Sequence, residues 1–322
     1  MKKMKPDITS RYGNLSSKNR DRSSLIFWVI LMIFSLLIES AQATSIETQS
    51  NLLITPKQLN NLAFEESVII DTRSKWKFLL SHISGAINLP DWKKFTSKQN
   101  GVPGMLILDR KLIAEKLQSL GIDNQKTIVL YGNPKNPWRT DGRFFWMFQR
   151  YGFQSVKILQ GGLAGWRNFG GEINIGLADR KKPSSLSAKD IKLNDSISAD
   201  KNWIRDRLAE GKIAIIDNRT KKEYDGSTPY GSKRGGHIPQ SIHIHWSEFF
   251  TDAGDMKPVK VLSAMLNKLG ITPDREVVVY CTGGVRSAMG FFVLKYLGYS
   301  VRNYDGSWWD WSRDNSLPVE NS

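Results

Sequence analysis

The chain has 322 residues, of which 40% are hydrophobic and 24% charged. This composition excludes a disordered protein and allows two domains of ordinary size. The formal net charge of +15 makes small anions more natural partners than cations. Nucleic acid is not an expected partner, because no dense basic run with interleaved aromatic residues follows the first 24 residues.

The N-terminus has the three parts of a secretory signal peptide. Basic residues precede an apolar run at residues 25–38, and Ala41-Gln-Ala43 then gives a small-x-small cleavage pattern. The apolar run is shorter than the roughly 20 residues that span a bilayer as a helix. We therefore expect residues 1–43 to be a cleaved signal peptide and the protein to be exported, to the periplasm. A membrane would be a partner only if residues 25–38 stayed uncleaved as an anchor.

The rest of the chain repeats itself. Val68-Ile-Ile-Asp-Thr-Arg73 recurs as Ala214-Ile-Ile-Asp-Asn-Arg219, and Gly161-Gly-Leu-Ala-Gly-Trp166 recurs as Gly306-Ser-Trp-Trp-Asp-Trp311. Matching features in the same order at nearly one spacing indicate a duplicated domain. The polar, Pro- and Ser-containing segment between the copies predicts a linker. We expect domains at 44–171 and 199–322, joined by a linker at 172–198.

Within the second copy, short β-branched runs alternate with helical patterns. Residues 213–216 and 276–280 are expected to be buried strands. Residues 259–269 and 287–297 are expected to be helices, each ended by a glycine. This order predicts an α/β fold, in which each domain has a parallel-sheet core with helices on both faces.

One loop of the second copy carries the candidate chemistry. Cys281, the only cysteine, follows the second strand, and Gly283 and Gly284 are able to take positive φ. Backbone N–H groups, the N-terminus of the next helix and the charge of Arg286 would then surround the sulfur, favour a thiolate and bind an anion. The predicted cradle for this anion comprises Thr282, Gly283, Gly284, Val285, Arg286 and Ser287. Without this context, a lone cysteine is more often a buried, inert thiol.

Cys-x-x-Gly-x-Arg after a buried strand resembles the active-site loop of the rhodanese family. The similarity covers roughly residues 52–313 and includes Gly236-His-Ile-Pro239 and Arg302-Asn-Tyr-Asp-Gly-Ser-Trp308. It implies two tandem rhodanese-like domains and a thiosulfate/3-mercaptopyruvate-type sulfurtransferase. Cys281 would carry sulfane sulfur as a persulfide from a small anionic donor to a thiol or cyanide, without a metal or an organic cofactor. It also implies an inactive first domain, in which Gly132 stands at the position of the cysteine.

The chain departs from the family pattern around the donor site. Gly283 stands where thiosulfate-type loops carry a basic residue, and Glu223 stands where an arginine often binds the donor. A carboxylate at position 223 would repel an anion. Arg286 could replace the missing charge, and thiosulfate is then the favoured donor. Other possible substrate-binding residues are Arg219, Lys233 and Arg234.

We weighed two alternative functions, of which one is retained. A cysteine phosphatase is disfavoured because its Cys-x5-Arg loop is one residue longer than Cys281–Arg286. A non-catalytic sulfur-carrier or protein-interaction module of the exported compartment is the retained alternative. His237 is expected to be a structural hydrogen-bonding residue. The cluster Trp308-Trp-Asp-Trp311 is expected to belong to the core and domain interface, with a place in the cleft wall as the alternative for Trp246 or Trp308.

Overall fold

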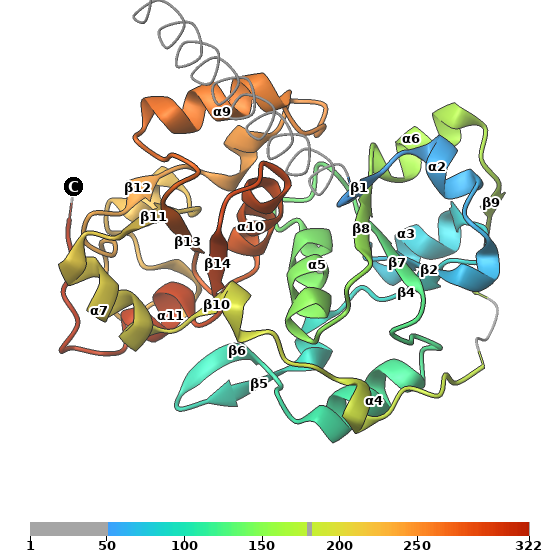
Figure 1. Cartoon of the computed structure of the whole chain (residues 1–322), viewed down its shortest axis with the longest axis horizontal. Coiled ribbons are helices and arrows are strands. Elements are labelled where there is room, and N and C mark those ends of the chain that lie inside the picture. The colour runs from blue at the N-terminus through green and yellow to red at the C-terminus, as the bar shows by residue number, and fades with distance from the viewer. Residues whose placement is uncertain (1–50, 179–181, 322) are drawn as a thin grey trace, which may run out of the picture. The chain divides into compact units, whose positions relative to one another are not determined.

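The apolar runs of the two sequence copies form two parallel sheets in the computed structural model (Figure 1). The structure describes residues 51–178 and 182–321. The predicted signal peptide at residues 1–43, with its apolar run 25–38, therefore lies outside the described residues. Among the described residues, no helix is both long and apolar enough to span a membrane.

The first sheet has the strand order β1-β8-β7-β2-β4, and all neighbours are parallel. Two small antiparallel pairs, β3–β9 and β5–β6, lie beside it. The strands are β1 (Leu53–Ile54), β2 (Ser67–Asp71), β3 (His82–Ile83), β4 (Ile87–Asn88), β5 (Thr96–Gln99), β6 (Val102–Leu106), β7 (Thr127–Tyr131), β8 (Val156–Leu159) and β9 (Ile173–Asn174). The helices are α2 (Pro56–Asn60), α3 (Lys75–Leu80), α4 (Arg110–Gln118), α5 (Thr140–Arg150) and α6 (Gly162–Phe169).

The second sheet repeats this plan with the order β10-β14-β13-β11-β12, again all parallel. Its strands are β10 (Ser198–Ala199), β11 (Ile213–Asp217), β12 (Ile242–His243), β13 (Glu276–Tyr280) and β14 (Val301–Tyr304). Its helices are α7 (Lys201–Glu210), α8 (Lys221–Tyr224), α9 (Val259–Lys268), α10 (Arg286–Tyr296) and α11 (Ser307–Trp311). Short 3₁₀ turns are η1 (Phe64–Glu66), η2 (Trp92–Phe95), η3 (Ala188–Asp190), η4 (Asp195–Ile197), η5 (Pro229–Gly231) and η6 (Trp246–Phe249). The strands and helices expected in the second copy are confirmed to within a residue at each end.

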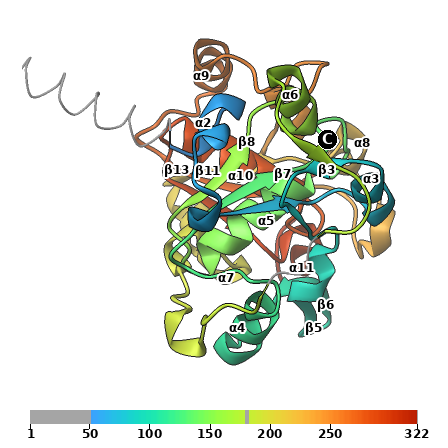
Figure 2. The ribbon, with the colours of Figure 1, turned by 90° about the vertical axis from the view of Figure 1, so that its right-hand side faces the viewer.

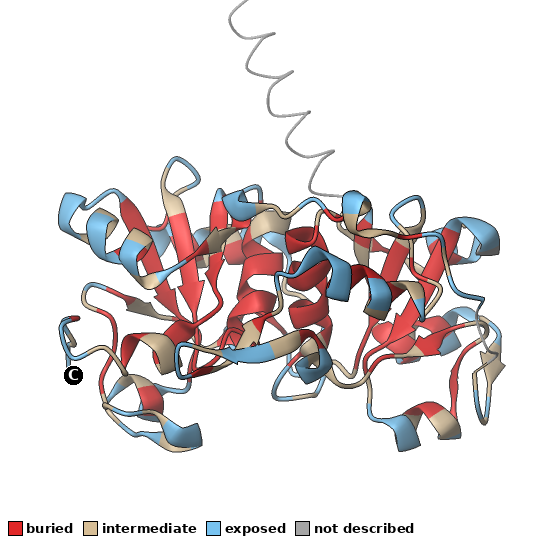
Figure 3. Cartoon of the chain, turned by 90° about the horizontal axis from the view of Figure 1, so that it is seen from below, coloured by how far each residue is buried: buried red, intermediate tan, exposed pale blue. Residues whose placement is uncertain are grey.

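Both faces of each sheet are covered, as the continuous apolar runs predict. Successive side chains of a strand point to opposite faces. In β11, Ala214 and Ile216 belong to the large core cluster, whereas Ile213 and Ile215 belong to a separate one. Figure 3 shows buried residues along the strands of both sheets and along the helices between them. The predicted α/β class, with helices on both faces of parallel sheets, is confirmed.

Of the predicted linker, 172–198, the part from residue 182 to residue 198 is packed against the first copy. Figures 1 and 2 show it running past α4 before it reaches β10. Leu186, Ile191 and Ile197 are buried members of the large core cluster. Although the segment is polar overall, these three apolar side chains pack in the core and fix the position of the segment.

The two copies meet along α5 and α10, which lie side by side in Figure 1. Phe145 and Phe292 pack edge to face with ring centroids 4.9 Å apart. A Cβ at Gly142 would lie 2.7 Å from the Cα of Met289, so the close approach requires glycine there. This shared core fixes one copy against the other, and it allows both to line one site.

Candidate active site

Cys281 lies at the carboxyl edge of the second sheet, directly after β13, and α10 begins at Arg286. In open α/β sheets this edge is where ligands bind. The residue is 1% exposed and lines a cavity of about 400 Å³. Its thiol is thus shielded from bulk solvent yet borders a space that is large enough for a small substrate.

The cavity is lined by both copies. The second copy contributes Cys281, Thr282, Gly283, Val285, Arg286, Tyr230 and Trp309, and the first contributes Pro90, Asp91, Trp92, Lys93, Trp138 and Thr140. Trp309 lines the cavity, whereas Trp308 and Trp246 are buried and do not line it. Trp308, a residue of α11, belongs to a buried core cluster, as expected, and the alternative place of Trp246 or Trp308 in the cleft wall is not seen.

The environment of Cys281 favours its thiolate. Burial by itself raises the pKa of the thiol, but the Arg286 charge and hydrogen bonds from Ser287 and from the Gly283 N–H outweigh it. The pKa of Cys281 is consequently lowered from the ordinary value of 9.0. The Ser287 hydroxyl lies 3.6 Å from Sγ and 2.7 Å from Oδ1 of Asn303.

Replacing Ser287 with alanine should move the alkylation profile of Cys281 to higher pH. The thiolate is the form that reacts, and Ser287→Ala removes one donor that stabilises it. The rate of alkylation by iodoacetamide, followed from pH 5 to pH 10, measures the midpoint. Because the Ser287 N–H remains, we expect a shift smaller than about one unit. An unchanged midpoint would show that this hydroxyl does not act on the sulfur.

The guanidinium of Arg286 is paired with the carboxylate of Glu223 in α8. Its guanidinium donates to both carboxylate oxygens of Glu223 at 2.8 and 2.7 Å, and both side chains are 4% exposed. The Thr282 hydroxyl donates to Glu223 at 2.6 Å. Burial raises the pKa of Glu223, but the bonds from Arg286 and Thr282 prevail and lower it to about 2. Glu223, expected to repel an anionic donor, and Arg286, expected to bind one, are thus paired with each other, so that their opposite charges compensate.

The two glycines of the loop serve different purposes. Gly284 has φ 71°, as predicted, and a Cβ there would lie 2.7 Å from the carbonyl oxygen of Asp305. Gly283 does not take positive φ. A Cβ on it would lie 2.3 Å from Cζ3 of Trp309, so glycine is needed because the indole packs directly on the backbone. The expectation of two positive-φ glycines holds for one.

The other possible substrate-binding cations, Arg219, Lys233 and Arg234, do not line the cavity, whereas Arg286 does. Arg219 donates to Asp217 and to the Gly236 carbonyl and is 1% exposed. Lys233 is exposed elsewhere, with its backbone N–H directed to the Ser312 hydroxyl. The guanidinium of Arg234 donates to the backbone carbonyls of Trp311, Ser312, Asp314 and Leu317. The guanidinium groups of Arg219 and Arg234 thus connect loops, because their N–H groups donate to carboxylate and backbone carbonyl oxygens of the protein.

The cation that does line the cavity without an ion-pair partner among the described residues is Lys93, in η2 of the first copy. Its side chain is exposed. Sequence reasoning missed it, since only the packing of the two copies brings position 93 to position 281. The available signal was the adjacent pair Trp92-Lys93, an aromatic and a basic residue between two predicted elements of the first copy.

The histidines have structural contacts. The His237 ring stacks on Tyr224 at 3.7 Å, and its Nδ1 lies 3.1 Å from the Tyr224 carbonyl. The Nε2 of His243 lies 2.8 Å from the Arg219 carbonyl. The structural role that we expected for His237 agrees with these contacts.

The chain thus has two tandem α/β domains and, in the second, a buried cysteine that lines a cavity at the carboxyl edge of the sheet. The rhodanese-like domain family matches residues 55–169 and again residues 200–314. The chain therefore belongs to the rhodanese family, and it is a tandem-domain sulfurtransferase.

Several known proteins are similar over most of the chain. A thiosulfate sulfurtransferase of Pseudomonas aeruginosa is 31% identical over 84% of this chain and 97% of that protein. The sulfur carrier protein TtuD of Thermus thermophilus is 34% identical over 64% of this chain and 75% of that protein. The solved structure of the 3-mercaptopyruvate sulfurtransferase SseA from Escherichia coli shares the fold, with a TM-score of 0.69 and 24% identity over 80% of this chain and 99% of that one.

Proposed function

We propose that Cys281 is the nucleophile of a two-step sulfur transfer from thiosulfate or 3-mercaptopyruvate. The observation that carries the proposal is a thiol of lowered pKa that lines a cavity at a helix N-terminus. A thiolate held there reacts without a metal or an organic cofactor.

In the first step the Cys281 thiolate attacks the outer sulfur of the donor. A sulfur–sulfur bond forms on Cys281 as the donor's bond to that sulfur breaks, and the electron pair leaves with sulfite or with the enolate of pyruvate, which then takes a proton. In the second step a thiolate or cyanide attacks the outer persulfide sulfur, and Cys281 leaves as a thiolate. Loop N–H groups near the sulfur, such as that of Gly283, stabilise the negative charge in both steps.

Intact-mass spectrometry tests the proposal. After incubation with thiosulfate or 3-mercaptopyruvate, the protein should gain the mass of one sulfur atom, and cyanide should remove it as thiocyanate. A Cys281→Ser variant is the matched control and should stay unmodified. If neither donor adds a sulfur to the wild-type protein, the persulfide mechanism is refuted.

The donor anion is proposed to bind at Lys93 rather than at Arg286. Because Glu223 is paired with Arg286, Lys93 is the remaining cation of the lining, which also holds one carboxylate, Asp91. Thiosulfate remains the favoured donor, in line with the name of the Pseudomonas relative. Thiosulfate is small enough for a single cation to bind it.

Replacing Lys93 with glutamine should raise the KM for thiosulfate by about three- to tenfold and change kcat little. An exposed charge pair contributes roughly 1 kcal/mol, which corresponds to this factor. Steady-state rates at low and high salt measure it, since the wild-type KM should rise with salt and that of the variant should not. Lys94→Gln, next in sequence but outside the lining, is the matched control. Equal KM values for Lys93→Gln and wild type would remove Lys93 from donor binding.

A sulfur-carrier role is the second candidate, favoured by the similarity to TtuD. It uses the same Cys281 persulfide but passes sulfur to a protein acceptor instead of a small molecule. Persulfide formation together with very slow thiocyanate release would favour the carrier over the enzyme.

Export to the periplasm remains part of the proposal. It is supported by the basic segment, the apolar run 25–38 and Ala41-Gln-Ala43. Cell fractionation followed by N-terminal sequencing tests whether residues 1–43 are removed. The proposed domain limits, 44–171 and 199–322, can be tested by limited proteolysis of the mature chain.

A further inference from the structure

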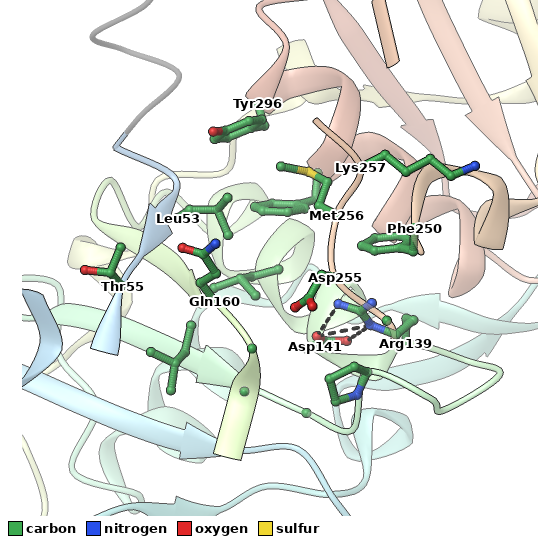
Figure 4. Close-up of a pocket in the computed structure, with 18 of the residues that line it drawn as sticks. Leu53, Thr55, Arg139, Asp141, Gln160, Phe250, Asp255, Met256, Lys257 and Tyr296 are labelled. Atoms are coloured by element: carbon green, nitrogen blue, oxygen red, sulfur yellow. Dashed lines mark hydrogen bonds and ion pairs between the residues drawn. The ribbon is translucent and has the colours of Figure 1, made fainter. Parts of the chain in front are cut away.

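A second cavity, of about 390 Å³, lies at the carboxyl end of the first sheet (Figure 4). Gly132 after β7 and Gln160 after β8 line it, together with Met256 and Tyr296 of the second copy. It shares no lining residue with the cavity at Cys281. Gly132 follows Tyr131 just as Cys281 follows Tyr280, so this cavity occupies the position in the first copy where the second copy keeps its reactive site.

The loop at this position is longer than its counterpart. It spans residues 132–139, between β7 and α5, whereas the loop between β13 and α10 spans residues 281–285. A Cβ at Gly132 would lie 3.1 Å from Cγ of Asp141, so Asp141 crowds the space beside a side chain at that position. The last residue of the loop, Arg139, has φ 44° and ψ 61°. Such a left-handed conformation is unfavourable for a non-glycine residue, and such outliers cluster at functional sites.

Arg139 is buried with one donor group unused. It is 5% exposed, and its Nε and Nη2 donate to Asp141 at 3.1 and 2.9 Å. Within the described part of the chain, Nη1 is buried and has no hydrogen-bond acceptor. A buried donor without an acceptor is energetically unfavourable. The guanidinium carbon lies 4.5 Å from the centre of the Phe250 ring, which covers it. A ligand oxygen that reaches Nη1 when Phe250 turns aside would satisfy this donor.

The charges around Arg139 select the kind of ligand. Asp141 compensates the guanidinium, and Asp255 adds a carboxylate on the cavity side of Arg139, whereas the Lys257 ammonium extends away from it (Figure 4). No ion pair links Arg139 to Asp255 among the described residues. A simple anion would meet the repulsion of Asp255, and a simple cation would leave Nη1 unsatisfied. A molecule with both a carboxylate and an ammonium group can satisfy Nη1 of Arg139 and pair with Asp255 at the same time.

The remaining lining fits the rest of such a molecule. Leu53, Met256 and Tyr296 give the cavity an apolar side opposite Arg139 (Figure 4). At its polar end, α6 begins without a side-chain cap, and Gly161 and Gly162 have φ of 69° and 53°. The free N–H groups of a helix N-terminus add favourable partners for a carboxylate.

We propose that this cavity is a binding site for a free amino acid with an apolar side chain. The carboxylate accepts hydrogen bonds from Nη1 of Arg139, the ammonium group pairs with Asp255, and the side chain packs against Met256 and Tyr296. The site is separate from Cys281 and does not depend on sulfur transfer.

Isothermal titration of the full chain with three matched probes tests this ligand class. The probes are L-leucine, 4-methylpentanoate, which lacks the ammonium group, and 3-methylbutylamine, which lacks the carboxylate. We expect leucine to bind at least about tenfold more tightly than either analogue, since one charge-assisted hydrogen bond contributes roughly 1.5–3 kcal/mol. Leucine that binds no better than its analogues, or does not bind, would overturn the proposal. The thiocyanate assay, run in parallel, reports the proposed sulfur transfer independently.

Two substitutions test the contacts. Asp255→Asn should weaken leucine binding about tenfold and leave 4-methylpentanoate binding equal or tighter, while Asp252→Asn, in the same loop outside the lining, should change neither. Arg139→Gln should abolish binding of both. If Arg139→Gln does not fold, the Asp255→Asn comparison decides. Leucine affinity that is unchanged by Asp255→Asn refutes the assigned contact and, with it, the proposed ligand class.

Discussion

Replacing Cys281 with serine is expected to reduce sulfur transfer by at least about a thousandfold, because the removal of a covalent nucleophile leaves only binding and electrostatic effects. A hydroxyl is too weak an acid to ionise in this loop as the thiol does, and it cannot form a persulfide. Thiocyanate release from thiosulfate and cyanide measures the loss.

The fold should tolerate this change. Cys281 is 1% exposed and serine is nearly isosteric, so the loop around it can keep its shape. Circular dichroism and the melting temperature of the variant provide the control. A variant that folds like the wild type and keeps its rate to within about tenfold would remove Cys281 from the chemistry.

The second large effect is expected at Glu223. Glu223→Gln leaves Arg286 buried without its counter-charge, and breaking a buried pair in this way costs about 3–5 kcal/mol of unfolding free energy. Urea denaturation measures the loss. The double variant Glu223→Gln with Arg286→Met should recover part of it, because it removes both charges. Glu276→Gln, which breaks the more exposed pair with Arg302, is the matched control and should cost no more than about 1 kcal/mol.

The pH dependence of the same pair has a definite sign. Folding lowers the pKa of Glu223 from 4.5 to about 2. A carboxyl with a depressed pKa contributes stability that is fully present above pH 4.5 and is lost as the pH falls toward about 2. The stability difference between wild type and Glu223→Gln should therefore shrink across this range. A constant difference from pH 6 to pH 2.5 would show that Glu223 is not ionised beside Arg286.

The duplicated architecture could be predicted because its signals are local. Runs such as Val277–Tyr280 and the glycines after α9 and α10 report strand and helix boundaries wherever they occur in a sequence. The loop at Cys281 could be predicted equally well, since its cysteine, glycines and arginine lie within six consecutive residues. Parallel strands then place that loop at the ligand-binding edge without any knowledge of distant contacts.

The donor site could not be predicted in this way. Whether the charge of Arg286 is free depends on Glu223, which is 63 positions away in the chain and 2.7 Å away in space. Likewise, Arg219 and Arg234 are indistinguishable in sequence from substrate-binding arginines until the carbonyls and carboxylates that occupy them are known.

By itself, the sequence of this protein determined two α/β domains and the position of its cysteine on the loop after a strand, because backbone preferences and hydrophobic periods act between near neighbours. Only the tertiary structure decided which cations remain available, that Lys93 of one copy lines the same cavity as Cys281 of the other, and that Arg139 lines a second cavity. The physical reason is that burial and ion pairing are properties of groups that packing brings together, and their spacing along the chain does not encode them.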